Sequence, residues 1–215
     1  MLILMFSIGN GYAGETTGKV HRVTFEFLPG GAIAVPSPLI IKQEGEPDLR
    51  FLAMYQTHSF SLPIYYSWRL GYRFSSSSWF ELEMNHLKLY LQNKPPEIER
   101  FTITHGFNQI WLNYKWRKKE NWYYTLGIGP VVAHPENTIR GLKLDESQGI
   151  YGKGYYIAGI TSQVAVQKKY YWGSHFFVSL ESKINLAYAR VKVVNGHAHV
   201  PAISLHGLAG IGVSF

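Results

Sequence analysis

Residues 202–215 alternate between two kinds of side chain, and this pattern constrains the fold more than any other. One set of positions is apolar or small: Ile203, Leu205, Gly207, Ala209, Ile211, Val213 and Phe215. The other set is mostly small or polar: Ser204, His206, Leu208, Gly210, Gly212 and Ser214. Because successive side chains of a β-strand point to opposite faces, the pattern predicts a strand with one apolar face. A strand covered on both faces would be apolar throughout, so a doubly covered parallel sheet is disfavoured.

The same alternation recurs along the chain and predicts eight strands. We expect them at residues 19–28, 62–74, 79–91, 101–117, 122–134, 155–167, 176–194 and 202–215. The alternation becomes ambiguous at residues 86–88, which indicates a β-bulge. Residues 32–60 contain three prolines and show no firm period, so we expect a long loop there, with room for a short hairpin at its tip.

The connections between these strands alternate in length. Residues 75–78, 118–121 and 168–173 are short turns, whereas the other connections are longer. Long outer loops and short periplasmic turns are typical of outer-membrane barrels. The sequence therefore predicts an all-β fold, an eight-stranded antiparallel transmembrane β-barrel. A barrel of this size is filled by side chains, so we do not expect a pore.

The composition agrees with a membrane barrel. Hydrophobic residues make up 46% of the chain and aromatic residues 15%, yet the mean hydropathy is only −0.09. Strands that interleave lipid-facing and lumen-facing residues have this balance. No apolar run reaches the roughly 18 residues that a transmembrane helix needs.

An eight-stranded soluble barrel of the lipocalin type is the main alternative, because it would turn the apolar face inward. Alternation alone does not separate the two. The face opposite the aromatic residues carries several charges, namely Arg69, Arg73, Glu81, Glu83, Glu181 and Lys183. Such charges pack more plausibly as pairs inside a barrel than around an apolar ligand, so we favour the membrane barrel.

The net charge of +7 would suit nucleic acid, a membrane surface or an anionic lipid. Lysine and arginine lie singly along the strands or in short connections such as Arg117-Lys118-Lys119, rather than clustered on one face, so we expect no nucleic-acid partner. The chain has no cysteine, which excludes disulfides and thiolate metal sites. Residues 1–13 resemble the end of a signal peptide cleaved after Ala13, which would leave residues 14–215 as the barrel.

The aromatic residue Phe215 at the end of the last strand resembles the assembly signal of bacterial outer-membrane β-barrels. This resemblance implies location in the outer membrane of a Gram-negative bacterium and recognition by the barrel-assembly machinery. Outer-membrane lipid and lipopolysaccharide would then surround the protein, which we expect to be a monomer.

With the amino terminus in the periplasm, three strands bring polar residues to the outer rim. These residues are His86, Lys88, Tyr90, Thr104, His105, Asn108, His134 and Glu136. Imidazole and carboxylate groups can act as base, acid or metal ligands. None of them has the spacing of a helical zinc motif, a nucleophile elbow or a phosphate-binding loop. The alternative is a polar rim that satisfies strand ends and contacts sugar or phosphate.

Three segments are similar to small barrels of the lipid A oxidase family. They are His86–Tyr90, which reads His-x-Lys-x-Tyr, then Phe101–Asn108 and Leu112–Tyr114. The Gly-rich strand at residues 126–130, the pair His134-Pro135 and the last strand also match. His105 stands where the family pattern would have an acidic residue. The resemblance implies oxidation of the proximal glucosamine of lipid A, with oxygen and a divalent metal such as iron.

On this hypothesis His105 and Glu136 are catalytic. Lys88, Tyr90 and Asn108 would bind substrate, and His86, His105 and His134 would bind the metal. Two alternatives stay open. One is a lipid A deacylase, although the His-x-Ser-Asn signature of that class is missing from the chain. The other is a non-catalytic structural or adhesive barrel.

Overall fold

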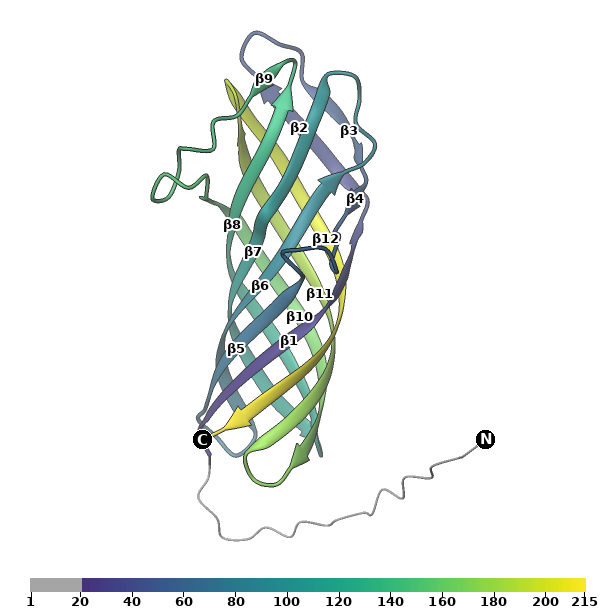
Figure 1. Ribbon diagram of the computed structural model, residues 1–215. Helices are drawn as coiled ribbons and strands as arrows, with labels where there is room; N and C mark the ends of the chain where they lie inside the picture. Colours follow the sequence, from purple (N-terminus) through teal and green to yellow (C-terminus); the bar gives the residue numbers. More distant parts are fainter. Residues whose placement is uncertain (1–20) are drawn as a thin grey trace, which may run out of the picture.

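Eight long strands close into a ring in the computed structural model, which describes residues 21–215 (Figure 1). Each strand pairs antiparallel with its neighbour in the order β1-β5-β6-β7-β8-β10-β11-β12, and β12 pairs with β1. Their bounds are Val23–Val35, Tyr66–Arg73, Ser78–Leu91, Ile98–Lys119, Trp122–Ile139, Tyr156–Trp172, Phe176–Val193 and Gly196–Ser214. The predicted eight-stranded antiparallel barrel is confirmed. The predicted signal peptide lies outside the described residues.

Four shorter strands extend the ring at one end: β2 (Ser37–Gln43), β3 (Leu49–Ala53), β4 (Tyr55–Gln56) and β9 (Leu142–Lys143). The prediction of a long loop over residues 32–60 was therefore wrong in most of its length, although the short hairpin expected within it is present as β2 and β3. β1 also does not stop at Pro29, because Gly30 and Gly31 continue the pairing with β12. A Cβ at Gly30 would lie 2.3 Å from the backbone oxygen of Gly207, so the glycine permits close strand contact here rather than a turn.

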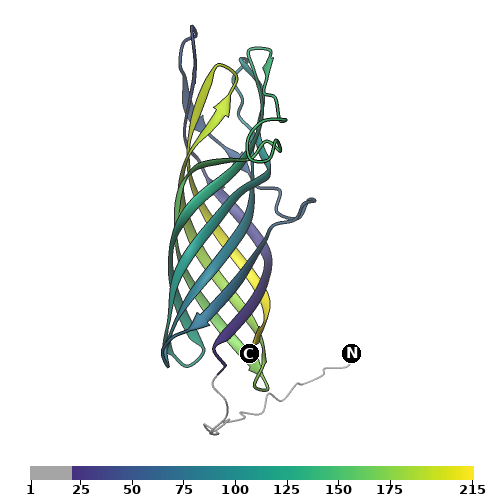
Figure 2. The same ribbon diagram turned by 90° about the vertical axis from the view of Figure 1, so that its left-hand side faces the viewer.

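Both ends of the described chain lie at the end of the barrel that carries the short turns (Figure 1). At the opposite end β8 and β12 continue further than predicted, since β8 runs to Ile139 and β12 begins at Gly196, whereas β5 begins only at Tyr66, later than the predicted residue 62. We call this part of the wall, together with β2, β3, β4 and β9, the extension. Figure 2 shows it rising above the rest of the ring. By the loop-length rule of outer-membrane barrels, the extension faces the outside of the cell.

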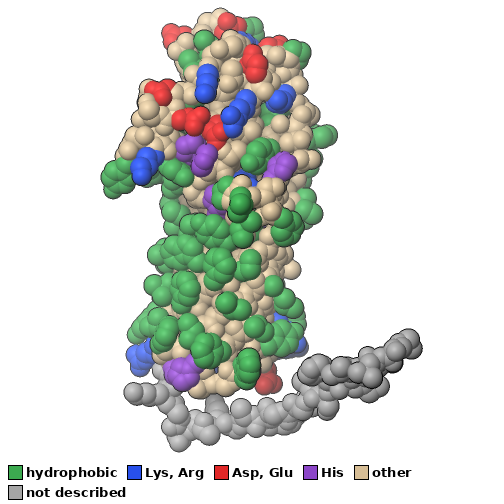
Figure 3. All heavy atoms as spheres, in the orientation of Figure 1, with side chains coloured by type: hydrophobic (Ala, Val, Ile, Leu, Met, Phe, Trp, Pro, Cys, Tyr) green, Lys and Arg blue, Asp and Glu red, His purple; other side chains and the backbone are tan. Residues whose placement is uncertain are grey.

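Apolar side chains form a belt around the outside of the lower barrel, which Figure 3 shows as a green band. Exposed members of this belt include Leu70, Leu82, Leu112, Leu126, Ile128, Val164, Leu180, Ile184 and Leu205. The belt faces outward, as a lipid-facing surface must, so the lipocalin alternative is wrong. Among residues 21–215, no helix is long and apolar enough to cross a membrane.

A network of buried charges fills the barrel inside this belt. Arg69 lies at its centre, 3.0 Å from Glu83, 2.9 Å from Glu181 and 3.3 Å from both Glu26 and Glu81. Three lysines also pair with these carboxylates: Lys115 with Glu81, Lys169 with Glu26 and Lys183 with Glu83. Four carboxylates therefore balance four cations away from water, which satisfies the requirement that buried charges be paired.

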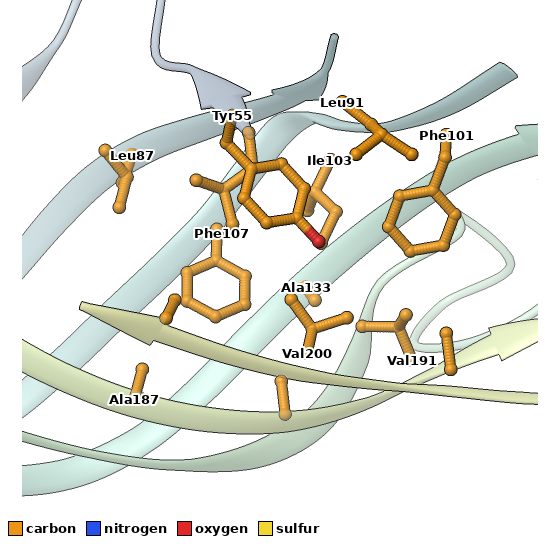
Figure 4. Close-up of a cluster of buried hydrophobic side chains, with 14 of the residues drawn as sticks. Tyr55, Leu87, Leu91, Phe101, Ile103, Phe107, Ala133, Ala187, Val191 and Val200 are labelled. Carbon is orange, nitrogen blue, oxygen red and sulfur yellow. The ribbon is translucent and has the colours of Figure 1, made fainter. Parts of the chain in front are cut away.

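The polarity of the wall reverses in the extension. Its interior holds an apolar cluster that includes Leu87, Leu91, Phe101, Phe107 and Val200 (Figure 4). Its exterior carries charged and histidine side chains above the green belt (Figure 3). The extension is thus built like a water-soluble barrel, which is expected for a segment outside the lipid.

Candidate metal centre

A bulge in β7 lies where the wall passes from the belt into the extension. Ile103 and Phe107 both point inward, and the three residues between them stand opposite the single residue Lys88 of β6. On the other side the same three residues stand opposite His134 of β8. The extra residues push the exposed side chain of His105 out of the ladder, over the outer face of β8.

The bulge brings His105 to His134 and Glu136. Their potential ligand atoms all lie within 4.8 Å of one another. Glu136 Oε1 is 2.9 Å from Nδ1 of His105 and 4.0 Å from Nδ1 of His134. The two imidazole rings lie 4.8 Å apart, centroid to centroid. We call these three side chains the His-His-Glu cluster.

The loop before β10 covers one side of this cluster. The ring of Tyr155 meets that of His134 edge-on at 4.9 Å, and its hydroxyl donates to the backbone oxygen of His105 over 3.0 Å. Gly154 sits so close that a Cβ there would lie 2.5 Å from Nε2 of His134. His134 and Glu136 are consequently buried, whereas His105 stays exposed and leaves one side of the cluster open.

Arg100 orients the carboxylate of the cluster. Its guanidinium forms an ion pair with Oε2 of Glu136, which leaves Oε1 directed toward the two imidazoles. The charges of Glu136 and Arg100 both affect the pKa of Tyr90 in β6. Burial raises the pKa of the Tyr90 hydroxyl, the Glu136 carboxylate adds to the rise, and Arg100 opposes it.

The other predicted site residues lie on the same side of the barrel but are held by different partners. His86 Nδ1 lies 2.9 Å from Oδ1 of Asn108, and the His86 ring stacks on Tyr66. Lys88 is buried and donates to the backbone oxygen of Ser61 over 2.7 Å. The structure thus groups Glu136, rather than His86, with the two other histidines.

The position of the site differs from the prediction in one respect. We expected the residues at strand ends, but β7 and β8 both continue past the cluster, so it lies on the outer wall rather than at the rim. Sequence reasoning missed Arg100 and Tyr155. Arg100 preceded the predicted start of its strand, and Tyr155 reaches the site only through the fold of a loop.

The donor set of the His-His-Glu cluster fits a divalent metal ion. His134 Nδ1 is buried without a hydrogen-bond partner among the described residues, which is unusual for a polar atom and is explained if it is a ligand. Two histidines with one carboxylate hold iron in non-haem oxygenases and zinc in hydrolases.

A hydrolytic triad fits less well. In a triad the acid and the nucleophilic hydroxyl contact opposite nitrogens of the imidazole. Here the hydroxyl of Thr104 approaches Nδ1 of His105 at 3.4 Å, the same nitrogen that faces Glu136. The geometry therefore favours a metal centre over nucleophilic ester cleavage.

The closed ring, the lipid-facing belt and the charged interior define the chain as an outer-membrane β-barrel. A scan of protein-family models and a search of curated proteins each found no match.

A search of solved structures found weak similarities. Ail of Yersinia pestis is 9% identical, with 91% of this chain and 99% of Ail covered and a TM-score of 0.43. The outer membrane protein AlkL is 13% identical, with 97% of each chain covered and a TM-score of 0.47. Neisserial surface protein A is 13% identical, with 90% of this chain and 96% of that chain covered and a TM-score of 0.41. These likenesses are low, so the class assignment rests on the strand order and the belt described above.

Proposed function

We propose that this barrel modifies lipid A at the cell surface, with a divalent metal ion held by His105, His134 and Glu136. The observation that carries the proposal is the convergence of these three side chains on the outer wall, further along β8 than the belt residues Leu126 and Ile128. That level of the wall adjoins the headgroups of the outer leaflet. The resemblance to lipid A oxidases supports oxidation as the reaction and iron as the metal.

Each residue around the cluster has a role in this proposal. The metal, when bound, would supply oxygen activation or Lewis-acid chemistry. Arg100 keeps the Glu136 carboxylate oriented, and its half-exposed guanidinium can also face a substrate phosphate. Tyr155 shields His134 from water on one side, while the exposed side of His105 admits the sugar.

Mass spectra of lipid A test the reaction. We expect a species with one added oxygen in cells that produce the protein and none in cells that do not. The variant His134→Ala should remove that species, because it deletes a buried ligand. The matched control is His175→Ala, a histidine at the short-turn end of the barrel, which should leave the spectrum unchanged. Heat-modifiable gel mobility checks that both variants fold.

The outcomes separate the candidate functions. Loss of an acyl chain instead of oxygen addition would assign a deacylase, and an unchanged spectrum would leave the structural or adhesive barrel. Metal analysis of the purified protein is a second measurement. We expect about one divalent ion per chain for the parent and far less for His134→Ala. A folded parent protein that binds no divalent ion would overturn the metal centre.

A further inference from the structure

A second group of charged residues lies on the outer wall of the extension, on β11, β12, β2 and β3. One row of paired residues crosses these four strands as Arg190, His199, Ile40 and Arg50. In the next row outward, His197 pairs with Lys42. This part of the wall is separate from the His-His-Glu cluster on β7 and β8, and none of its residues takes part in that site.

The surface is hollowed at this place. A pocket of about 230 Å³ lies between the β2–β3 hairpin and β12, lined by Pro38, Ile40, Lys42, Arg50, Tyr188, His199 and Pro201. Its lining therefore combines three apolar side chains with two cations, an imidazole and a phenol. A hollow of this chemistry suits an anion that is attached to a bulky, partly apolar body.

Positive charge is in excess around the hollow. The carboxylate of Asp48 contacts two of the cations that line the hollow, at 2.8 Å from Arg50 and 3.8 Å from Lys42. Arg190 approaches Nδ1 of His197 at 3.0 Å, and the Nε2 atoms of His197 and His199 lie 3.1 Å apart. Desolvation lowers the pKa of the His197 imidazole, and Arg190, His199 and Lys42 lower it further. One carboxylate therefore faces three cationic side chains and two imidazoles.

The hollow sits immediately above the lipid-facing belt. Leu186 and Ile203 form an exposed pair in the last apolar row, and the next pair toward the outside is Tyr188 with Pro201. The row of Arg190 and His199 follows directly. A lipid whose chains lie against Leu186 and Ile203 would thus place its headgroup at the cations.

We propose that this hollow binds a phosphate group of lipid A in the outer leaflet. Lys42, Arg50 and Arg190 would contact the phosphate, His199 and Tyr188 would contact the sugar, and the acyl chains would lie on the belt below. Phosphate oxygens make charge-assisted hydrogen bonds with these donors, which are stronger than neutral ones. The inference does not depend on the metal centre, because binding requires none of its residues.

Binding of lipid A to the purified barrel in lipid nanodiscs tests this site. Metal-free protein is used, so that the result is independent of the proposed reaction. The probes are bis-phosphorylated lipid A, the same lipid A after phosphatase treatment, and inorganic phosphate. We expect tight binding of the phosphorylated lipid alone. The double variant Lys42→Gln/Arg50→Gln should weaken it by about tenfold or more, because two charge-assisted contacts are lost.

The matched control is Lys143→Gln, which removes an exposed charge from β9 of the extension, away from the hollow. It should change the affinity little. The proposal would be overturned by equal binding of dephosphorylated lipid A, by equal affinity of a correctly folded double variant, or by an equal loss in the control variant. Inorganic phosphate that bound as tightly as lipid A would also overturn it and would identify a site for a free anion instead.

Discussion

At the scale of single residues, the lipid-facing belt makes a sharp prediction for Leu70. Its side chain is 47% exposed on the outer face of β5. The variant Leu70→Arg would place a charge against the hydrocarbon of the membrane, so we expect it to lose about 2–4 kcal/mol of stability. Urea unfolding of the barrel in lipid vesicles, followed by tryptophan fluorescence, measures the difference.

Leu52 supplies the matched control, because it is 54% exposed on β3 of the extension. The same change to arginine there meets water, and we expect it to cost less than about 0.5 kcal/mol. Equal losses for Leu52→Arg and Leu70→Arg would show that the apolar side chains of the belt do not face lipid.

At the scale of elements, the β7 bulge should control the metal centre. Gly106 has a φ of +131°, and a Cβ there would lie within 2.4 Å of the Asn108 side chain. We expect Gly106→Ala to cost about 1–3 kcal/mol and to reshape the bulge, so that His105 leaves the cluster and metal binding weakens. Isothermal titration with Fe²⁺ or Zn²⁺ measures the affinity.

Gly45, at the tip of the β2–β3 hairpin, provides the control variant, because an alanine there strains the backbone far from the metal site. Its φ is +76°, but a Cβ added there would meet no side chain or backbone of another segment within 4 Å. Gly45→Ala should therefore strain the backbone without changing metal affinity. If Gly106→Ala bound metal as well as the parent did, the bulge would have no part in building the site.

The sequence predicted the elements inside the membrane well, because lipid outside and charge inside keep one polarity along each face. In β6, for example, Leu82 and Met84 were correctly opposed to Glu81 and Glu83. Above the membrane the same faces exchange polarity, with Leu87 pointing inward. A period-two pattern does not show that exchange by itself, and the ends of β1, β7, β8 and β12 in the extension were predicted too short.

The candidate site was predictable from the sequence only in part. Strand order alone placed His105, His134 and Glu136 on neighbouring strands at the same level. Their grouping depends on the two-sided register shift of β7 against β6 and β8, which is a long-range property of the sheet. The ion pair between Arg100 and Glu136 was also missed. It forms because β7 begins at Ile98, earlier than the alternation of its side chains indicates.

At the scale of the whole molecule, the reversal of polarity fixes how deep the barrel sits. The belt must lie in hydrocarbon, and the extension, with its apolar interior and charged exterior, must lie in water. Both proposed sites stand at the boundary between these two parts, on different sides of the ring. The fold would therefore present the proposed metal centre and the proposed cationic hollow to the same layer of lipid headgroups.

This orientation predicts which surfaces an external reagent reaches. The chain has no cysteine, so a single introduced thiol can be labelled without background. Glu44 is exposed at the tip of the β2–β3 hairpin, and Glu120 is exposed in the short turn between β7 and β8. In intact cells, a maleimide on a long polyethylene glycol chain should label Glu44→Cys and leave Glu120→Cys unlabelled. After the outer membrane is permeabilised, both should react, because both positions face water. Labelling of Glu120→Cys alone in intact cells would mean that the extension points into the periplasm, and neither proposed site could then meet lipid A in the outer leaflet.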